Sequence, residues 1–232
     1  MSDSPPVLLQ INGLQKSFRG PDGTRQRIVN VPAFTLAAGS QRALAGESGS
    51  GKSTFLNLIA GILPVDAGAI HFNGVNIAAF GESRRDAFRA QNLGYIFQTF
   101  NLLQGYTCLE NILLGMTFGR GVDRVRAVNL LQRVGLGDRL HHRPHQLSTG
   151  QQQRVAVARA LANLPKLVLA DEPTGNLDRK NSLAALALIR ETCREQGTAL
   201  LLVSHDRGVL DQFADVQDFH QINQVPATEA AV

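Results

Sequence analysis

A glycine-rich turn between a strand-like run and a helical pattern limits the fold of this chain more than any other feature. Residues 42–45, 167–170 and 199–203 are short runs without polar alternation, as expected for parallel strands covered on both faces. The first run leads directly into the turn, and residues 54–60 follow with the apolar spacing of a helix that ends before Pro64. A strand, a tight turn and a helix in this order predict an α/β core.

The turn matches the pattern G-x-x-x-x-G-K-[ST] in full, in the strand-to-helix context that this pattern requires. Small residues let backbone N–H groups surround the phosphates of a nucleotide, and the N-terminal end of the next helix adds positive potential. Lys52 supplies a charge near the β- and γ-phosphates, and Ser53 is suited to bind Mg²⁺. A flexible loop without a ligand is the alternative, but a chance match in a chain this long is on the order of one in a hundred. The residues predicted to bind the nucleotide here are Gly46, Glu47, Ser48, Gly49, Ser50, Gly51, Lys52, Ser53 and Thr54.

Two adjacent acids, Asp171 and Glu172, follow the run at 167–170. They therefore lie at the C-terminal edge of a buried strand, where open α/β sheets bind their ligands. Asp171 is suited to hold Mg²⁺ through water, and Glu172 is suited to orient or polarise the water that attacks the γ-phosphate. Without the glycine-rich turn, a strand that ends in a solvated turn would be the better interpretation. With it, a catalytic pair is favoured.

The region before the core predicts an antiparallel sheet. Residues 7–18 and 28–36 are strand-like around a turn-prone segment at 20–23, and residues 68–77 form a third strand-like stretch. We expect these three segments to form a sheet at the edge of the core.

The middle of the chain is helical in pattern. Thr107 and Glu110 have the spacing of a capping box, and a second helical pattern covers residues 123–134 before Gly135. We expect a small helical subdomain at about residues 100–160, inserted into a single domain that spans residues 1–232.

Composition excludes several classes of protein. Apolar runs are far shorter than the roughly 20 residues of a membrane-spanning helix, and residues 1–6 lack a signal for export, so a cytoplasmic protein is expected. Cys108 and Cys193 show no metal-binding spacing and are expected to be reduced core residues. The net charge of +4 is too small and too dispersed to indicate nucleic acid. Nine arginines between residues 84 and 143 face four acids there, which fits a partner-facing surface or a solvated helical face.

A second anion site is predicted at residues 147–151, with the sequence Leu-Ser-Thr-Gly-Gln. Ser148 is a good N-cap, so its hydroxyl, the N–H of Gly150 and the helix dipole together favour an anion. This segment resembles the signature motif of ABC transporter ATPases. The resemblance implies that Ser148, Gly150 and Gln151 face the γ-phosphate of ATP bound to a second copy, so that two ATP molecules lie between two chains.

Further landmarks extend this resemblance from about residue 7 to residue 215. Gln98 is similar to the glutamine that senses Mg²⁺ and the attacking water, and His205 to the histidine that contacts the γ-phosphate. Asp178 ends a segment similar to the loop that crosses the dimer interface. Phe18 stands where a tyrosine more usually stacks on adenine, although it could equally be a core residue. The resemblance thus implies Glu172, His205, Gln98 and Lys52 as catalytic residues and Ser53, Gln98 and Asp171 as metal ligands.

Within this family, residues 163–178 and 142–148 most resemble the lipoprotein-release and macrolide-export subfamily. The fold implied is a P-loop NTPase (RecA-like) α/β core with an antiparallel β subdomain and an inserted helical subdomain. One departure is Thr149, which stands where the signature usually has glycine; a β-branched residue is less permissive at a helix start. We expect activity to survive this change, at an unchanged or a slower rate.

The function implied is that of an ATP-hydrolysing subunit that needs ATP and Mg²⁺ and acts on a separately encoded membrane permease, for export or lipoprotein release. Its expected partners are a second copy, the permease and in some systems a periplasmic adaptor, and its expected location is the inner face of the cell membrane. Phe97, Phe100, Leu102 and Leu103 form either part of the permease groove or ordinary core. One alternative is a nucleotide switch that regulates a membrane complex without transport. A soluble ATPase acting on nucleic acid or the ribosome is disfavoured, because such proteins usually carry two cassettes or a coiled-coil insertion.

Overall fold

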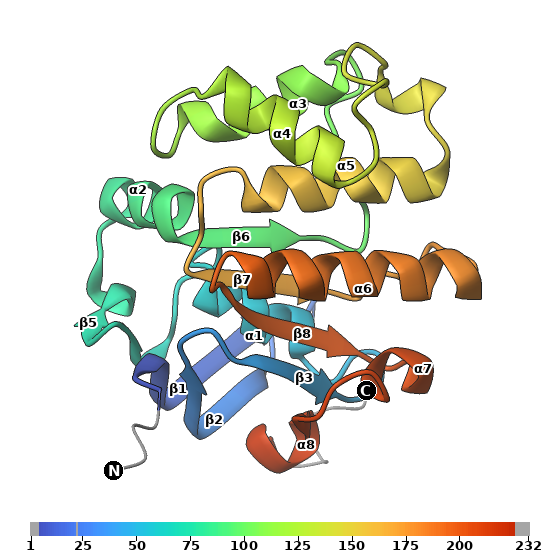
Figure 1. Cartoon of the computed structure of the whole chain (residues 1–232). Helices are drawn as coiled ribbons and strands as arrows, with labels where there is room; N and C mark the ends of the chain where they lie inside the picture. The colour runs from blue at the N-terminus through green and yellow to red at the C-terminus, as the bar shows by residue number, and fades with distance from the viewer. Residues whose placement is uncertain (1–4, 22, 226–232) are drawn as a thin grey trace.

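The computed structural model describes residues 5–21 and 23–225, and within them the chain forms two sheets and a group of helices (Figure 1). One sheet is antiparallel, with the strand order β2-β1-β4-β5. Its strands are β1 (Val7–Arg19), β2 (Arg25–Ala37), β4 (Ala67–Phe72) and β5 (Val75–Asn76). The other sheet is parallel, with the order β6-β7-β8-β3-β9. Its strands are β3 (Gln41–Ala45), β6 (Leu93–Ile96), β7 (Leu167–Asp171), β8 (Ala199–Ser204) and β9 (Val216–Asp218).

The parallel sheet confirms the predicted α/β core. The three predicted runs form β3, β7 and β8, and every residue of β8 is buried. Side chains of β7 alternate between two hydrophobic clusters: Leu167 and Leu169 pack into one, Val168 and Ala170 into the other. The sheet is therefore covered on both faces, which explains why its strands show no polar alternation.

The register of the parallel sheet places three strand ends side by side. Ala45 of β3 pairs with Ser204 of β8, and Asp171 of β7 pairs with Val203 of β8. Because parallel strands run in one direction, the segments that follow β3, β7 and β8 all leave the sheet at the same edge.

The helices cover the parallel sheet on both faces (Figure 1). Within the described residues the helical elements are α1 (Lys52–Ile59), α2 (Glu82–Asn92), α3 (Cys108–Thr117), α4 (Arg124–Arg133), α5 (Thr149–Leu161), α6 (Arg179–Glu195), α7 (Arg207–Leu210) and α8 (Phe219–Ile222), with the 3₁₀ turns η1 (Ile77–Ala79) and η2 (Pro144–Gln146). Helices α3, α4 and α5 pack on one another and sit above the sheet. The assignment of residues 100–160 to a separate subdomain stays a prediction.

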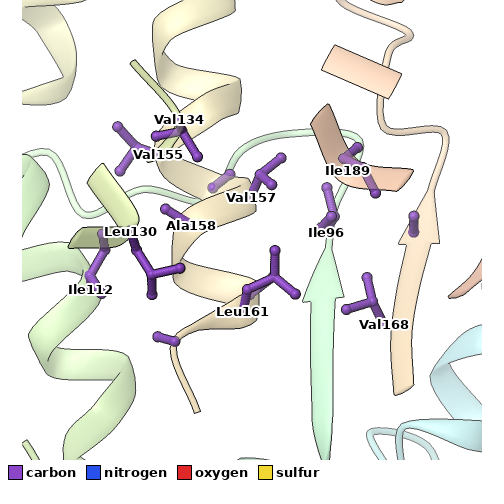
Figure 2. Packing of buried hydrophobic residues seen from close by; sticks show 14 of the residues in the cluster. Ile96, Ile112, Leu130, Val134, Val155, Val157, Ala158, Leu161, Val168 and Ile189 are labelled. Carbon is purple, nitrogen blue, oxygen red and sulfur yellow. The ribbon is translucent and has the colours of Figure 1, made fainter. Parts of the chain in front are cut away.

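Helix α5 joins this helical layer to the sheet. Figure 2 shows α5 residues, among them Val157 and Leu161, between Ile112 and Leu130 of the helical layer and Ile96 of β6. All five side chains belong to one hydrophobic cluster. Helix α5 is therefore held in place by packing on both sides.

Local signals for the helices are borne out. Thr107 Oγ1 accepts the N–H of Glu110 at 3.3 Å, and the Glu110 carboxylate accepts the N–H of Thr107 at 2.8 Å, which completes the predicted capping box. Asp123 caps α4, whose last residue lies just before Val134. Cys108 and Cys193 are buried free thiols, as predicted.

The prediction of one strand over residues 68–77 was wrong. The chain turns at Asn73 and Gly74, which have φ of +48° and +78°, so two short antiparallel strands replace one. Left-handed backbone of this kind forms a tight hairpin turn, for which Asn-Gly is the favoured pair. The predicted turn at 20–23 includes residue 22, which lies outside the described residues. In the described part of the chain, none of the helices has the length and apolar character needed to cross a bilayer.

A substitution at Phe55 of α1 tests the packing on one face of the parallel sheet. Its ring is fully buried, with centroids 5.5 Å from Phe34 of β2 and 5.4 Å from Phe219 of α8. Replacement by alanine leaves a cavity, so Phe55→Ala should lower the free energy of unfolding by about 3–5 kcal/mol in denaturant titrations. The matched control Phe118→Ala removes a ring that is 70% exposed and should change it by less than about 0.5 kcal/mol. Equal losses in the two variants would contradict the assigned core.

Candidate functional site

The glycine-rich loop lies between β3 and α1 and folds against β2. Gly51 has φ +96°, and a Cβ at this position would lie 2.8 Å from the carbonyl oxygen of Ile28. Only glycine fits such a close approach. Gly51 is also the N-cap of α1 and makes no side-chain cap, so the first N–H groups of the helix are not satisfied by a capping side chain. This arrangement is a cradle suited to an anion.

Lys52 folds back over the loop. Its Nζ donates to the carbonyl oxygens of Gly46 at 2.7 Å and Glu47 at 2.6 Å, and the residue is only 5% exposed. Burial lowers the pKa of Lys52, while the charges of Glu172, Asp171 and Glu47 act in the opposite direction. The ammonium group is thus held at the loop, close to Asp171 at the end of β7 and to Glu172 just after it.

Ser53 and Asp171 meet across the strand ends. Ser53 Oγ donates to Asp171 Oδ1 at 2.9 Å. Burial raises the pKa of Asp171, the hydrogen bond from Ser53 lowers it, and the charge of Glu172 raises it further. A hydroxyl and a half-buried carboxylate side by side are hard oxygen donors of the kind that Mg²⁺ binds with few protein ligands, so these residues fit the predicted ion.

Glu172 has an unusual backbone and a crowded carboxylate. Its φ of +44° lies in the left-handed region, which is rare for a residue other than glycine and recurs at functional sites. Its carboxylate accepts Ser204 Oγ at 3.0 Å, the N–H of His205 at 3.0 Å and His205 Nδ1 at 2.7 Å. Nδ1 therefore carries a proton, because the carboxylate is the acceptor. The His205 side chain is 59% exposed, whereas that of Glu172 is only 11% exposed.

Most of these groups line one pocket of about 220 Å³, whereas the predicted residues Gly46, Glu47, Ser50 and Asp171 lie outside its lining. Its lining residues are Ile28, Ser48, Gly49, Gly51, Lys52, Ser53, Thr54, Gln98, Glu172 and His205. The structure thus brings Gln98, Lys52, Glu172 and His205 together. The carbonyl oxygen of Gln98 accepts Asn176 Nδ2 at 2.7 Å, so the segment before Asp178 holds the backbone of Gln98.

Ser148, Gly150 and Gln151 lie outside the lining of this pocket. Ser148 caps α5 with an exposed side chain: its Oγ accepts the N–H of Gln151 at 3.3 Å, and Gln151 Oε1 accepts the N–H of Ser148 at 2.9 Å. Asp178 caps α6 and is also outside the lining. Its carboxylate accepts the N–H of Asn181 at 3.0 Å. Within one chain, these groups make a separate surface at two helix starts.

Phe18 is on the antiparallel sheet and is not a core residue. It is 42% exposed, and the ammonium of Lys16 lies 5.6 Å from its ring centroid. An exposed aromatic face can stack on a flat ring, but Phe18 does not line the pocket described above.

The apolar residues around Gln98 separate into core and surface. Leu102 is buried and belongs to a hydrophobic cluster, so it is core and does not form a groove surface. Phe97 stacks on Tyr95 with centroids 4.1 Å apart. Leu103 is 43% exposed, and Phe100 is half-buried against the core.

Sequence reasoning missed four residues of the site region: Ile28, Asn176, Ser204 and Asn223. Ser204 and Asn176 adjoin motifs that were identified, so proximity to the motifs could have indicated them. Ile28 lines the pocket only because β2 packs on the glycine-rich loop. Asn223 donates to the carbonyl oxygen of Ser50, 173 positions away in the chain, and no local pattern indicates it.

Comparisons with known proteins agree with this geometry. A family model described as ABC transporter matches residues 29–175. The chain is 42% identical, over 89% of its length and 87% of the relative's, to the lipoprotein-releasing system ATP-binding protein LolD of Shewanella frigidimarina. It is similar in structure to a dimeric bacterial ABC transporter cassette, MJ0796, with a TM-score of 0.80, 33% identity and coverage of 88% of this chain and 90% of that one.

A second structure of MJ0796, a dimer in a post-hydrolysis state bound to ADP and Pi, is similar to the same extent: the TM-score is 0.80, with 32% identity and coverage of 88% and 90%. Family, relatives and fold agree with the expected P-loop α/β architecture. This chain belongs to the ABC transporter family and is one of its ATP-binding, ATP-hydrolysing subunits.

Proposed function

We propose that this chain binds Mg-ATP in the pocket at the strand ends, dimerises with a second copy around two nucleotides, and drives a separately encoded permease in lipoprotein release. The observation that carries this proposal is the meeting of Lys52, Ser53, Glu172 and His205 in one pocket, with Asp171 hydrogen-bonded to Ser53 beside it. The name of its LolD relative supports lipoprotein release, and the dimeric MJ0796 structures support the second copy. Through the permease, the chain is placed at the inner face of the cell membrane.

The phosphate loop and Lys52 bind the nucleotide. Backbone N–H groups of the loop and of the start of α1 donate hydrogen bonds to the phosphate oxygens, and the ammonium moves from the carbonyls of Gly46 and Glu47 to the phosphate oxygens. Ser53 and Asp171 would hold Mg²⁺, with Gln98 nearby in the pocket. When bound there, the ion would supply positive charge that offsets the charge of the phosphates.

Glu172 acts as general base and His205 positions it. A water oxygen bonds to the γ-phosphorus as the bond from that phosphorus to the β,γ-bridging oxygen breaks, and ADP leaves with the electron pair. Glu172 takes the proton of the water. A carboxylate has about four acceptor sites and three hydrogen bonds from Ser204 and His205 use part of them, so capacity for the water remains.

The exposed start of α5 supplies the other half of the site in the second copy. Ser148, Gly150 and Gln151 surround the positive end of a helix that is fixed by packing, which suits it to the γ-phosphate of ATP held by the partner. Thr149 is the first residue of α5 and is exposed, so its side chain does not prevent the helix start. Asp178, at the start of α6, belongs to the same surface: a Cβ on Gly150 would lie 3.5 Å from Oδ1 of Asn181.

Replacement of the general base Glu172 should leave ATP binding intact and slow ATP hydrolysis. Glu172→Gln removes the proton acceptor but leaves the phosphate cradle, so the variant should bind ATP, hydrolyse it at least about 100-fold more slowly and accumulate as a dimer. Size-exclusion chromatography with and without ATP measures the dimer. The control Glu82→Gln changes an exposed carboxylate at the start of α2 and should behave as wild type. An ATP-loaded Glu172→Gln protein that elutes only as a monomer would speak against the proposal.

Loss of the lysine should abolish nucleotide binding. Lys52→Ala removes the buried charge nearest the phosphate loop, and calorimetry should show ATP affinity reduced by at least about 100-fold, as for a charge-assisted contact at a buried site. Lys166→Ala, at an exposed lysine before β7 on the opposite edge of the sheet, is the control and should leave affinity unchanged. Wild-type affinity in Lys52→Ala would remove the phosphate-loop assignment.

A further inference from the structure

One side chain from the C-terminal segment reaches the phosphate loop. Asn223 follows α8 and is only 8% exposed. Its Nδ2 donates to the carbonyl oxygens of Ile28 at 3.0 Å and Ser50 at 3.2 Å, and its Oδ1 accepts the N–H of Asn30 at 2.7 Å. An amide NH₂ has two donor hydrogens, so each of the two carbonyls receives one. Asn223 therefore joins the loop to β2.

The hydrogen bond to Ser50 determines where the next N–H points. The carbonyl of Ser50 and the N–H of Gly51 belong to one peptide group, and in a trans peptide they point in opposite directions. The described residues contain no cis peptide bond. Because Asn223 holds the carbonyl at the side of β2, the N–H of Gly51 is directed the other way. Gly51 lines the pocket proposed for the phosphates, so the orientation of this peptide decides how its N–H meets them.

The packing around Gly51 leaves little freedom for a different arrangement. A Cβ there would lie 2.8 Å from the carbonyl oxygen of Ile28 and 3.5 Å from Asn223 Nδ2. Without the amide, the carbonyls of Ser50 and Ile28 lose their shared donor. Two carbonyl oxygens that share no donor repel each other, and rotation of the Ser50–Gly51 peptide relieves this repulsion at the expense of the inward N–H.

We propose that Asn223 is a positioning residue for nucleotide binding, which acts through the Ser50–Gly51 peptide and does not contact the nucleotide itself. The inference rests on the proposed role of the phosphate loop. It gives the segment after α8 a role in the site, and no motif of the phosphate loop indicates that role.

The test is nucleotide affinity. In Asn223→Ala, Kd for Mg-ATP and for Mg-ADP, measured by calorimetry, should both rise about three- to tenfold, as for the loss of one or two hydrogen bonds. KM for ATP should rise in parallel, while kcat at saturating ATP stays within about twofold, because Glu172 and His205 are untouched. Asn223→Asp keeps the acceptor for the N–H of Asn30 but loses both donors, and should weaken binding at least as much.

The matched control is Asn30→Ala. It removes the hydrogen bond from Asn30 Nδ2 to the carbonyl oxygen of Gln224, 2.8 Å long, and so loosens the same C-terminal segment without touching the amide of Asn223. This variant should lower the thermal midpoint but keep ATP affinity within about twofold of wild type. Wild-type affinity in Asn223→Ala, or an equal loss in Asn30→Ala, would overturn the inference.

Two further outcomes are distinguished from these: a variant that does not fold, and a wild-type chain that does not bind ATP. If Asn223→Ala does not fold, Asn223→Asp, nearly identical in shape, gives the deciding affinity: wild-type binding by this variant overturns the inference. If the wild-type chain itself does not bind ATP, the proposed function is wrong for a reason that does not involve Asn223.

Discussion

The pairing of β8 with both β3 and β7 is the constraint on which the rest of the site depends. Each of these strands ends in a segment with different chemistry: a phosphate loop, a pair of acids, and a serine followed by a histidine. Parallel pairing in register brings all three to one edge. The hydrogen bonds from Ser204 and His205 to Glu172 cross directly between two of these strand ends, so a slip of one residue in the register would break them.

Charge balance explains why this edge needs a ligand. Lys52 and Glu172 are buried and Asp171 is half-buried, and the burial that raises the pKa of Asp171 also lowers that of Lys52. Buried charges are costly unless they are paired, and here one ammonium faces two carboxylates. In the proposed complex, a magnesium ion with a triphosphate would supply both a cation for the acids and anions for the lysine. The protein alone satisfies Lys52 with backbone carbonyls of the loop.

The sequence predicted most of the parallel core and most of the pocket, because both depend on short local signals. Unalternating runs identified β3, β7 and β8, and capping residues identified α3 and α4. Helix α2 was not predicted because none of its residues is buried, so its sequence shows no apolar period that would indicate a helix. The prediction of one strand over 68–77 was wrong because the Asn73–Gly74 pair forms a hairpin turn within it. The role of Asn223 was not predicted because it arises only when α8 packs beside β2.

The geometry of a single chain leaves its chemistry incomplete. Ser148 and Gly150 sit at the exposed start of α5, outside the pocket that holds Lys52 and Glu172. Our account therefore requires each catalytic site to combine the pocket of one copy with the α5 start of another. Dimers of the related cassette MJ0796 are consistent with this requirement.

Mixing two inactive variants tests that requirement most directly. One chain carries Glu172→Gln and the other Ser148→Arg, and ATP hydrolysis is measured for each alone and for the mixture. If sites are shared, the mixed dimer contains one site with both defects and one intact site, so the mixture should hydrolyse ATP well above either variant alone. A mixture no more active than its components, although mixed dimers form, would contradict the account.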